Sequence, residues 1–343
     1  MDILTRLDSQ ANYTTTQLQL ILGAWVLATP FERKAKISLH DGDVAEDDYD
    51  KRSIYSLLYS LYRSMGVVRS ESGQPYEFTF NTWGYAWPAG WGEAPSGGTD
   101  PQRFGKNAYT GLFEFAQVKD RLRERDGEVH VVEMGCGTGA GAHHICGKVL
   151  PRCTYEAIDM QRAAIQTCRR KFVPELDGRL VAICTDATRT TIRDEAADFV
   201  VICETHVAEM TGQVTDEDRL FFRTAHRLLK PGGFLVWGNA IPSLTWPLCF
   251  DFLKSIGMEL CEVKDVTPEA VAARDADEGR VEAYVSQCLD RFFGFRIPFL
   301  GNKKRAQAGQ AMKNFYRNPG TSLYTNMKDG TDAYKVALLR KAS

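Results

Sequence analysis

Apolar residues follow two different periods along the chain. Near the N-terminus they recur at helical spacing, which predicts an amphipathic helix over 54–65. From Val129 onward, short apolar runs rich in β-branched residues alternate with helical stretches. These runs are predicted strands at 129–133, 153–158, 180–184, 198–203, 234–238, 258–263 and 334–339. Strands that alternate with helices predict an α/β fold with a doubly wound, mostly parallel seven-stranded sheet.

The segments between the strands carry helix signals. Helices are predicted at 17–27, 107–125, 140–149 and 216–229, and Lys230–Gly233 is a predicted turn that stops the last of these. The stretch from Thr267 to about Phe315 is predicted to be helical with a break near 292–298. This stretch is longer than a doubly wound sheet needs, so it is predicted to help close a substrate pocket.

Glycines follow the first predicted strand at alternate positions, Gly135, Gly137, Gly139 and Gly141. Such a turn between a strand and a helix lets the backbone approach a ligand closely, as nucleotide sites require. Glu133 stands two residues before the first glycine, at the end of the strand. A carboxylate there would repel a pyrophosphate and attract an ammonium group.

Two further acids end the next strands. Asp159 lies 20 residues after Gly139, which matches the spacing of about 20 residues expected for an acid that binds a ribose diol. Asp186 and Ala187 follow the third strand, where they would meet the adenine amino group and ring. The predicted ligand is an adenosine without phosphates and with a positive charge near Glu133, which is S-adenosylmethionine.

A dinucleotide site is the alternative interpretation of the same glycines. The pattern Gly137-x-Gly139-x-x-Ala142 also fits the dinucleotide fingerprint. Glu133 is misplaced for a pyrophosphate, and a long segment precedes the motif, so S-adenosylmethionine is favoured.

The segment Glu133-Met134-Gly135-Cys136-Gly137-Thr138-Gly139 resembles the first motif of the class I S-adenosylmethionine-dependent methyltransferases, and Leu229–Leu235 resembles a turn that recurs in them. The resemblance implies a Rossmann-like fold whose last strand runs antiparallel. It also implies a set of cofactor-binding residues: Glu133, Gly135, Cys136, Gly137, Gly139, Asp159, Met160, Asp186, Ala187 and Cys203.

The fourth strand ends in Glu204-Thr205-His206, where a base for methyl transfer is expected. In O-methylation, His206 would take the proton of a hydroxyl group. In C-methylation of an alkene, Glu204 and aromatic side chains would stabilise a carbocation. Alternatively, Glu204 holds the cofactor or caps a turn, and His206 is hydrogen-bonded in the core. A third interpretation of the whole protein is a cofactor-binding protein without catalysis.

Six aromatic residues crowd the segment from Phe78 to Trp91. The segment is similar to one that folds over cofactor and acceptor in methyltransferases of lipids and terpenoids. Tyr155–Asp159 resembles the second motif of the sterol, tocopherol, phthiotriol and phenolphthiotriol dimycocerosate methyltransferases, and Asn81–Tyr85 resembles a segment of the last group. These families carry Glu-x-x-His or Glu-x-x-x-His where this chain departs with the tighter Glu204-x-His206. The resemblance implies a hydrophobic small-molecule acceptor, with plain core packing as the alternative for the aromatics. The predicted pocket residues are Trp83, Tyr85, Trp87, Tyr59 and Phe295.

The predicted domain organisation follows from this resemblance. Residues 1–105 are expected to form a helical and aromatic lid region. Residues 106–343 are expected to form the methyltransferase domain, with acceptor-covering helices at about 267–317. A diphosphate acceptor would need Mg²⁺ and a basic cluster, which the sequence does not offer, so no metal site is predicted and a hydroxyl acceptor is favoured.

Composition agrees with a globular enzyme. The chain has 44% hydrophobic and 25% charged residues, and its net charge of −2 argues against a nucleic-acid partner. The nine cysteines form no Cys-x-x-Cys pair, which favours free thiols in a reducing cytoplasm. The apolar stretch Leu18–Ala28 is shorter than the ~20 residues of a membrane helix. We therefore expect a cytoplasmic protein without a membrane span, and a homodimer is left open.

Overall fold

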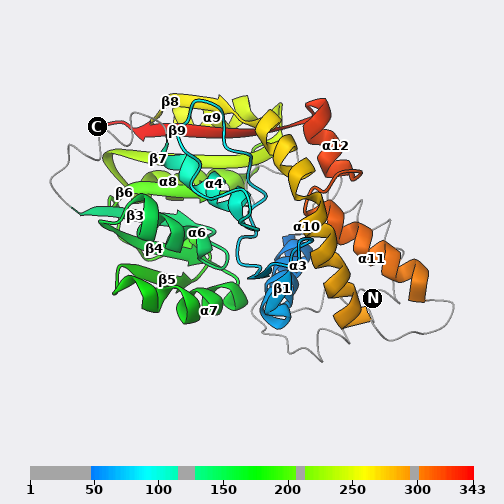
Figure 1. Cartoon of the computed structure of the whole chain (residues 1–343). Coiled ribbons are helices and arrows are strands. Elements are labelled where there is room, and N and C mark those ends of the chain that lie inside the picture. Colours follow the sequence, from blue (N-terminus) through cyan, green and yellow to red (C-terminus); the bar gives the residue numbers. More distant parts are fainter. Residues whose placement is uncertain (1–47, 115–127, 206–212, 294–300) are drawn as a thin grey trace. The chain divides into compact units, whose positions relative to one another are not determined.

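The structure is a computed structural model that describes residues 48–114, 128–205, 213–293 and 301–343. The chain divides into two compact units (Figure 1). The first comprises Met1–Thr79, Gln161–Ala164 and Arg274–Asn326, and the second comprises Phe80–Met160, Ile165–Ala273 and Met327–Ser343. Each unit has its own hydrophobic core.

The second unit is built on a seven-stranded sheet. Its strands are β3 (Val129–Met134), β4 (Cys153–Asp159), β5 (Leu180–Cys184), β6 (Ala197–Cys203), β7 (Leu229–Pro242), β8 (Met258–Asp265) and β9 (Asp332–Lys341). They follow the order β5-β4-β3-β6-β7-β9-β8, from the lower to the upper edge of the sheet in Figure 1. Strand β9 pairs antiparallel with β7 and β8, and the pairs from β5 to β7 are parallel. The predicted doubly wound, mostly parallel sheet is confirmed, and so is the antiparallel last strand.

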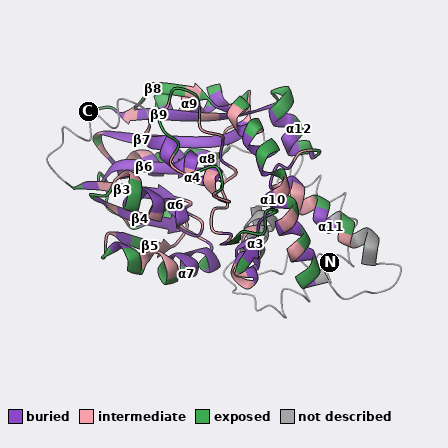
Figure 2. Cartoon of the chain, in the orientation of Figure 1, coloured by how far each residue is buried: buried purple, intermediate pink, exposed green. Residues whose placement is uncertain are grey.

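Both faces of the central strands are buried because alternate residues of each enter different cores. On β3, Val131 lies in one hydrophobic cluster and Val132 in the other. Helices α4 (Arg103–Phe113) and α6 (Ala140–His144) contribute to the first cluster, and α8 (Asp216–Leu228) and α9 (Thr245–Ser255) contribute to the second. The central strands are accordingly purple in Figure 2. Continuous apolar runs are what such a doubly covered strand requires.

Two predicted boundaries are corrected by the structure. The predicted turn Lys230–Gly233 lies within β7, which begins at Leu229 directly after α8. The predicted helix 140–149 is α6 followed by a π-helical segment, η2 (Ile145–Val149), whose last turn places Leu150 N 2.7 Å from Ile145 O. Such π turns concentrate at functional sites in proteins. Of the predicted helix 107–125, residues up to Phe113 are helical in α4, and 115–127 lie outside the described residues.

The remaining elements of the second unit connect the strands. They are α7 (Arg162–Lys171) from Ile165 onward, η3 (Val173–Leu176), η4 (Ala187–Arg189), the first turns of α10 (Thr267–Phe293) and the last residues of α12 (Ser322–Asp329). Helix α8 begins with a capping box, because Thr215 accepts a hydrogen bond from the Asp218 amide and the Asp218 carboxylate accepts one from the Thr215 amide. This cap fixes the start of the helix that follows β6.

The first unit contains α3 (Asp48–Met65), the hairpin β1 (Val67–Arg69) and β2 (Pro75–Glu77), most of α10, α11 (Gly301–Phe315) and the start of α12 (Ser322–Asp329). The predicted helix over 54–65 is confirmed as part of α3. Its core is aromatic: the Tyr62 and Tyr316 hydroxyls are 2.7 Å apart, and Phe78 packs on both rings. Tyr59, a predicted pocket residue, is buried in this cluster and stacks on Tyr55.

The division into two compact units does not follow the predicted domain boundary at residue 105. Residues up to Thr79 group with Arg274–Asn326, whereas the aromatic segment from Phe80 groups with the sheet. The lid role of the N-terminal region stays a prediction. The predicted helix 17–27 and Phe295 lie outside the described residues.

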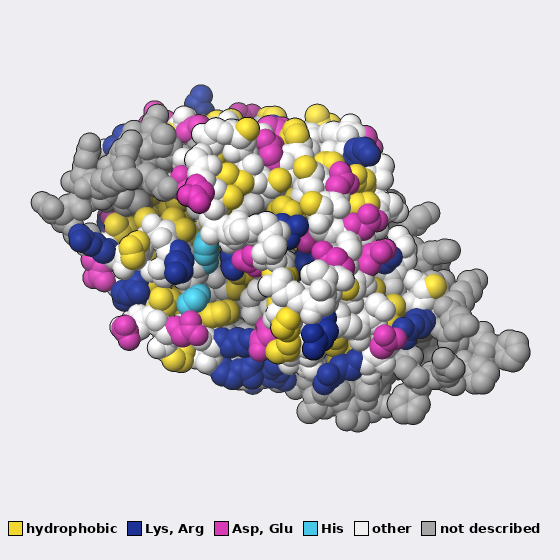
Figure 3. Space-filling model, in the orientation of Figure 1, with side chains coloured by type: hydrophobic (Ala, Val, Ile, Leu, Met, Phe, Trp, Pro, Cys, Tyr) yellow, Lys and Arg dark blue, Asp and Glu magenta, His cyan; other side chains and the backbone are white. Residues whose placement is uncertain are grey.

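The surface carries both signs of charge. Figure 3 shows Lys and Arg side chains as well as Asp and Glu side chains across the described part of the visible face. Among the helices of the described residues, none is long and apolar enough to cross a membrane. All nine cysteines are free thiols, and seven of them are buried.

Candidate cofactor and active site

The glycine turn lies at the carboxyl end of β3, where the chain passes into α6. Gly135, Gly137 and Gly139 all have positive φ, at 88°, 55° and 79°. A Cβ on Gly139 would lie 2.2 Å from the Cys168 sulfur, so α7 packs directly on the backbone of the turn. The glycines are therefore required by the path of the chain, and they leave main chain rather than side chains along this edge.

The acid at the end of β4 contacts this turn. The Asp159 carboxylate accepts a hydrogen bond of 2.8 Å from the Gly137 amide, and the Ile158 carbonyl accepts from the Gly135 and Cys136 amides. The half-buried Asp159 is thus oriented beside the glycine turn. Two positions predicted from separate strands to bind one nucleoside are adjacent.

The acid after β5 is also held in place. Asp186 caps η4, and its Oδ1 accepts hydrogen bonds from the Thr188 amide and hydroxyl at 2.9 and 2.8 Å. Its Oδ2 makes no hydrogen bond with any other described residue, and the side chain is half-buried. Ala187 is buried, whereas Met160 is partly exposed. Asp186 therefore presents an oriented acceptor, as an adenine amino group requires.

Glu133 has a different environment from the other predicted acids. Its carboxylate is fully buried and accepts hydrogen bonds from the Tyr109 hydroxyl at 2.8 Å and the Tyr155 hydroxyl at 3.1 Å. Burial raises the pKa of Glu133 to about 7, although the two tyrosine donors oppose this shift. The observed role is a link between β3, β4 and α4. The predicted contact with an ammonium group stays a prediction.

The turn after β6 is a second polar centre. Cys203 is buried, and Glu204 adopts a left-handed backbone with φ of 46° while its amide donates to the Gly238 carbonyl at 2.8 Å. The Glu204 carboxylate accepts hydrogen bonds from three groups: the Trp83 amide at 2.6 Å, the Gly84 amide at 2.8 Å and the Tyr334 hydroxyl at 2.7 Å. His206, the predicted base, lies outside the described residues.

Thr205 connects this turn with the glycine turn. Its hydroxyl donates to the Met134 carbonyl at 2.9 Å, and its own carbonyl accepts from the Asn239 amide group at 2.9 Å. The residue that immediately precedes His206 is therefore fixed to the end of β3 and to β7. Thr205, the last described residue before the predicted base, is thus held beside the glycine turn.

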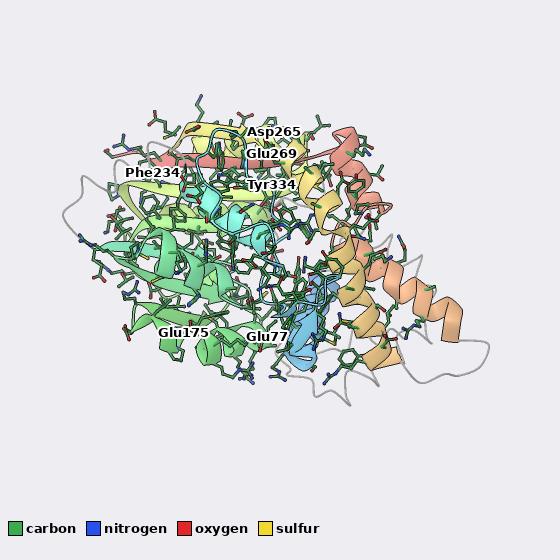
Figure 4. The ribbon with its side chains drawn as sticks, in the orientation of Figure 1. Glu77, Glu175, Phe234, Asp265, Glu269 and Tyr334 are labelled. Carbon is green, nitrogen blue, oxygen red and sulfur yellow. The ribbon has the colours of Figure 1, made fainter. Side chains whose placement is uncertain are left out.

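Sequence reasoning missed Tyr334 and Asn239. Tyr334 lies opposite Ala240, near the carboxyl end of β7, because β9 runs antiparallel. Phe234 pairs with Phe199 of β6 and lies near the amino end of the parallel strands. In Figure 4 the labels of Phe234 and Tyr334 lie at opposite ends of the sheet. Asn239 is fully buried within an otherwise apolar strand. A polar residue within the apolar run from Phe234 to Ile241 was the available signal.

The aromatic segment packs within the second unit. Tyr85 is fully buried and makes edge contacts with Tyr334 and Trp91, so the core-packing alternative describes this residue. Trp83 and Trp87 are half-buried, and the Trp87 indole donates to the Gly92 carbonyl at 3.1 Å. Trp83 is joined to Glu204 through its backbone amide and so lies beside the turn after β6.

Comparisons with known proteins agree with this architecture. The family described as a methyltransferase domain matches residues 131–233, from β3 into β7. The [4+2]-cyclase SpnF is 17% identical with a TM-score of 0.51, over 84% of this chain and 94% of that chain. A putative sarcosine dimethylglycine methyltransferase from Galdieria sulphuraria is 12% identical with a TM-score of 0.52, over 70% and 86%. A geranyl diphosphate methyltransferase in complex with SAM is 13% identical with a TM-score of 0.50, over 77% and 100%.

No curated protein matches the sequence. At these identities the solved structures support the fold alone. The domain match and the order of the seven strands define a class I methyltransferase fold. The residues at the carboxyl edge fit the cofactor of that class, since the glycine turn exposes main chain and Asp186 offers an oriented oxygen. The chain contains a methyltransferase domain at residues 131–233, and the protein is an enzyme whose cofactor is S-adenosylmethionine, as the sequence predicts.

Proposed function

We propose that this enzyme methylates a hydroxyl group on a hydrophobic small molecule, such as a lipid, a polyketide or another secondary metabolite. The observation that carries the proposal is the hydrogen bond between the Thr205 hydroxyl and the Met134 carbonyl. It joins the turn before His206 to the end of β3, directly before the glycine turn. His206 follows Thr205 directly in the sequence, and Thr205 is held beside the predicted cofactor residues by this hydrogen bond.

Cofactor binding is assigned to the acids that follow the first strands. Asp159 binds the ribose hydroxyls, and the Oδ2 atom of Asp186 accepts a hydrogen bond from the adenine amino group. Met160 and Ala187 line the adenine ring, and the backbone of Gly135–Gly139 passes beside the methionine part. The support is the orientation of both carboxylates by neighbouring amides, at 2.8 Å for Asp159 and 2.9 Å for Asp186.

Bound S-adenosylmethionine supplies an electrophilic methyl group on its sulfonium. The protein must hold the acceptor oxygen in line with this methyl group and remove the hydroxyl proton. An unperturbed imidazole titrates near neutral pH, so His206 is suited to take this proton. The net charge of −2 and the mixed surface charges give no support to a polyanionic acceptor.

Methylation of a carbon atom in an isoprenoid alkene is the second candidate. The Trp83 amide is 2.6 Å from the Glu204 carboxylate, so an aromatic ring and an anion occur in one region of the second unit. Such a pair can stabilise a carbocation. The structurally similar geranyl diphosphate methyltransferase makes this chemistry worth testing.

The test is incubation of the enzyme with isotopically labelled methyl donor and with lipid and polyketide extracts. Mass spectrometry before and after incubation identifies any metabolite that gains one labelled methyl group. An O-methyl carbon in the product's NMR spectrum supports the proposal, whereas a C-methyl carbon supports the second candidate. The Asp159→Ala variant serves as the control for cofactor-dependent labelling.

A further inference from the structure

Glu204 has a left-handed backbone, and its carboxylate accepts hydrogen bonds from two backbone amides and one hydroxyl. We infer that it is a positioning residue that fastens the aromatic segment, Phe80–Trp91, to the carboxyl edge of the sheet, and that it does not act as the base. The inference rests on the proposed function, because the aromatic segment is taken to contact the acceptor. It deepens that proposal by separating the two residues that the sequence offers as bases.

The three donors to Glu204 come from parts of the chain that are far apart in sequence. Trp83 and Gly84 precede it by about 120 residues, at separations of 121 and 120, and Tyr334 follows it by 130. Both carboxylate oxygens are used, since Oε2 accepts from Trp83 and Oε1 accepts from Gly84 and Tyr334. One carboxylate therefore joins the aromatic segment, the turn after β6 and the start of β9.

The backbone of Glu204 is fixed independently of its side chain. Its φ of 46° is a left-handed conformation that a residue with a Cβ adopts only when its surroundings require it. Two hydrogen bonds to β7 hold this conformation: the Glu204 amide donates to the Gly238 carbonyl, and the Thr205 carbonyl accepts from the Asn239 side chain. Strand β7 thus sets the direction in which the carboxylate leaves the turn.

The aromatic segment offers a matching surface. Gly84 has φ of 65°, and a Cβ on it would lie 1.9 Å from the Phe104 carbonyl oxygen, so the chain turns tightly against the start of α4. After the turn, the Tyr85 carbonyl accepts from Asn107 and the Ala86 amide donates to the Glu269 carbonyl. This tight turn directs the Trp83 and Gly84 amides together at one acceptor.

These contacts are poorly suited to proton transfer. The Glu204 carboxylate accepts charge-assisted hydrogen bonds from the Trp83 amide, the Gly84 amide and the Tyr334 hydroxyl. A proton on Glu204 would remove the negative charge that strengthens these three hydrogen bonds. A general base takes up a proton in every reaction cycle, so in that role Glu204 would weaken its own hold on the aromatic segment each time.

The test uses Glu204→Gln and Tyr334→Phe, with Glu262→Gln on the exposed strand β8 as a matched control. Amide hydrogen exchange of the segment 80–91 is measured first, because it requires no acceptor. We expect exchange in this segment to rise about tenfold or more in Glu204→Gln and less in Tyr334→Phe, with no change in the control. Unchanged exchange in Glu204→Gln would overturn the inference even if no acceptor is ever found.

Kinetics with an identified acceptor provide the second readout. A positioning residue predicts that Glu204→Gln raises KM for the acceptor about tenfold, while the pH dependence of kcat keeps its shape. Tyr334→Phe should shift KM in the same direction by a smaller factor. A loss of the acidic limb of the kcat profile in Glu204→Gln, with normal KM and normal kinetics in Tyr334→Phe, would instead identify Glu204 as the base. Failure of wild-type turnover with hydroxyl acceptors would count against the proposed function and leave the exchange result intact.

Discussion

The two ends of the same parallel strands carry polar clusters of different construction. At the carboxyl end, Asp159 and Glu204 accept hydrogen bonds from backbone amides of turns. At the amino end, charged side chains pair with one another: His130 contacts Glu156 at 2.9 Å, and Lys230 contacts Asp198 at 2.8 Å. Asp198 also accepts a hydrogen bond of 3.0 Å from the His130 amide, which belongs to a strand and not to a turn. A cluster of charged residues alone therefore does not indicate a site. Its place along the strand direction does, because connections after parallel strands leave amides and open main chain where a ligand can approach.

Substitutions at the carboxyl end of the strands should reduce activity the most. Replacing His206 with alanine is expected to slow turnover by about 10²- to 10⁴-fold, as the loss of a general base does, while cofactor affinity stays near the wild-type value. Turnover with the identified acceptor and calorimetry with S-adenosylmethionine measure the two effects. His130→Ala, at the amino end, is the matched histidine control and should leave kcat unchanged. Equal losses in both variants would remove the distinction between the two ends.

The buried carboxyl group of Glu133 should make the free energy of unfolding depend on pH. Burial raises its pKa from 4.5 to about 7, so the unfolded chain releases this proton at lower pH than the folded protein does. The free energy of unfolding should therefore fall as pH rises from about 4.5 to 7, by roughly 3 kcal/mol at most. Urea unfolding of wild type and Glu133→Gln across this range measures the slope. The variant should lack the decline, and parallel curves for the two proteins would contradict the raised pKa.

Asp159 tests the cofactor half of the carboxyl end. Asp159→Ala removes the predicted ribose contact and should weaken S-adenosylmethionine binding by about 1 to 3 kcal/mol, the cost of an unmet buried hydrogen bond. The alanine also removes the acceptor of the Gly137 amide, so Asp159→Asn, which keeps one oxygen, is the control and should lose less. Calorimetric titration gives both affinities. Unchanged affinity in the alanine variant would rule out the ribose role.

His130 at the amino end should produce the smallest effect. Its hydrogen bond to Glu156 raises its pKa above the ordinary value of 6.5, partly opposed by burial. The folded protein therefore binds this proton more tightly, and the stabilisation is complete below pH 6.5 and is lost as pH rises through the raised pKa. Because the pair is partly exposed, we expect a few tenths to about 1 kcal/mol. Thermal unfolding of His130→Gln should lack this dependence, and cofactor affinity should not change.

Residue periodicity and motif spacing were sufficient for the sheet. All seven predicted strands are present, and the glycine turn, Asp159 and Asp186 stand at the carboxyl ends of β3, β4 and β5. Local sequence could do this because a doubly covered strand needs an unbroken apolar run and a tight turn needs glycine. The extent of β7 was missed because Pro231 and the two glycines that follow look like a loop, whereas pairing with neighbouring strands extends the chain there.

The partners of the acids could not be predicted in the same way. Glu133 and Glu204 are both acids at or after the end of a strand, and the sequence gives no sign that one is bound by two tyrosine hydroxyls and the other by two backbone amides and one hydroxyl. Those partners lie between 22 and 130 residues away. The helix over 54–65 was predictable from its period, but the burial of Tyr59 in an aromatic core required the packing of α10 and α11.

The sequence by itself determined the sheet, the glycine turn and the nucleoside it fits, because each depends on neighbouring residues and on the direction of a single strand. Only the tertiary structure decided what each acid does. Hydrogen bonding is short-ranged and directional, so the role of a carboxylate depends on which donors the fold brings within about 3 Å of it. For Glu204 those donors come from the aromatic segment and from β9, which reaches this edge only because it runs antiparallel to β7.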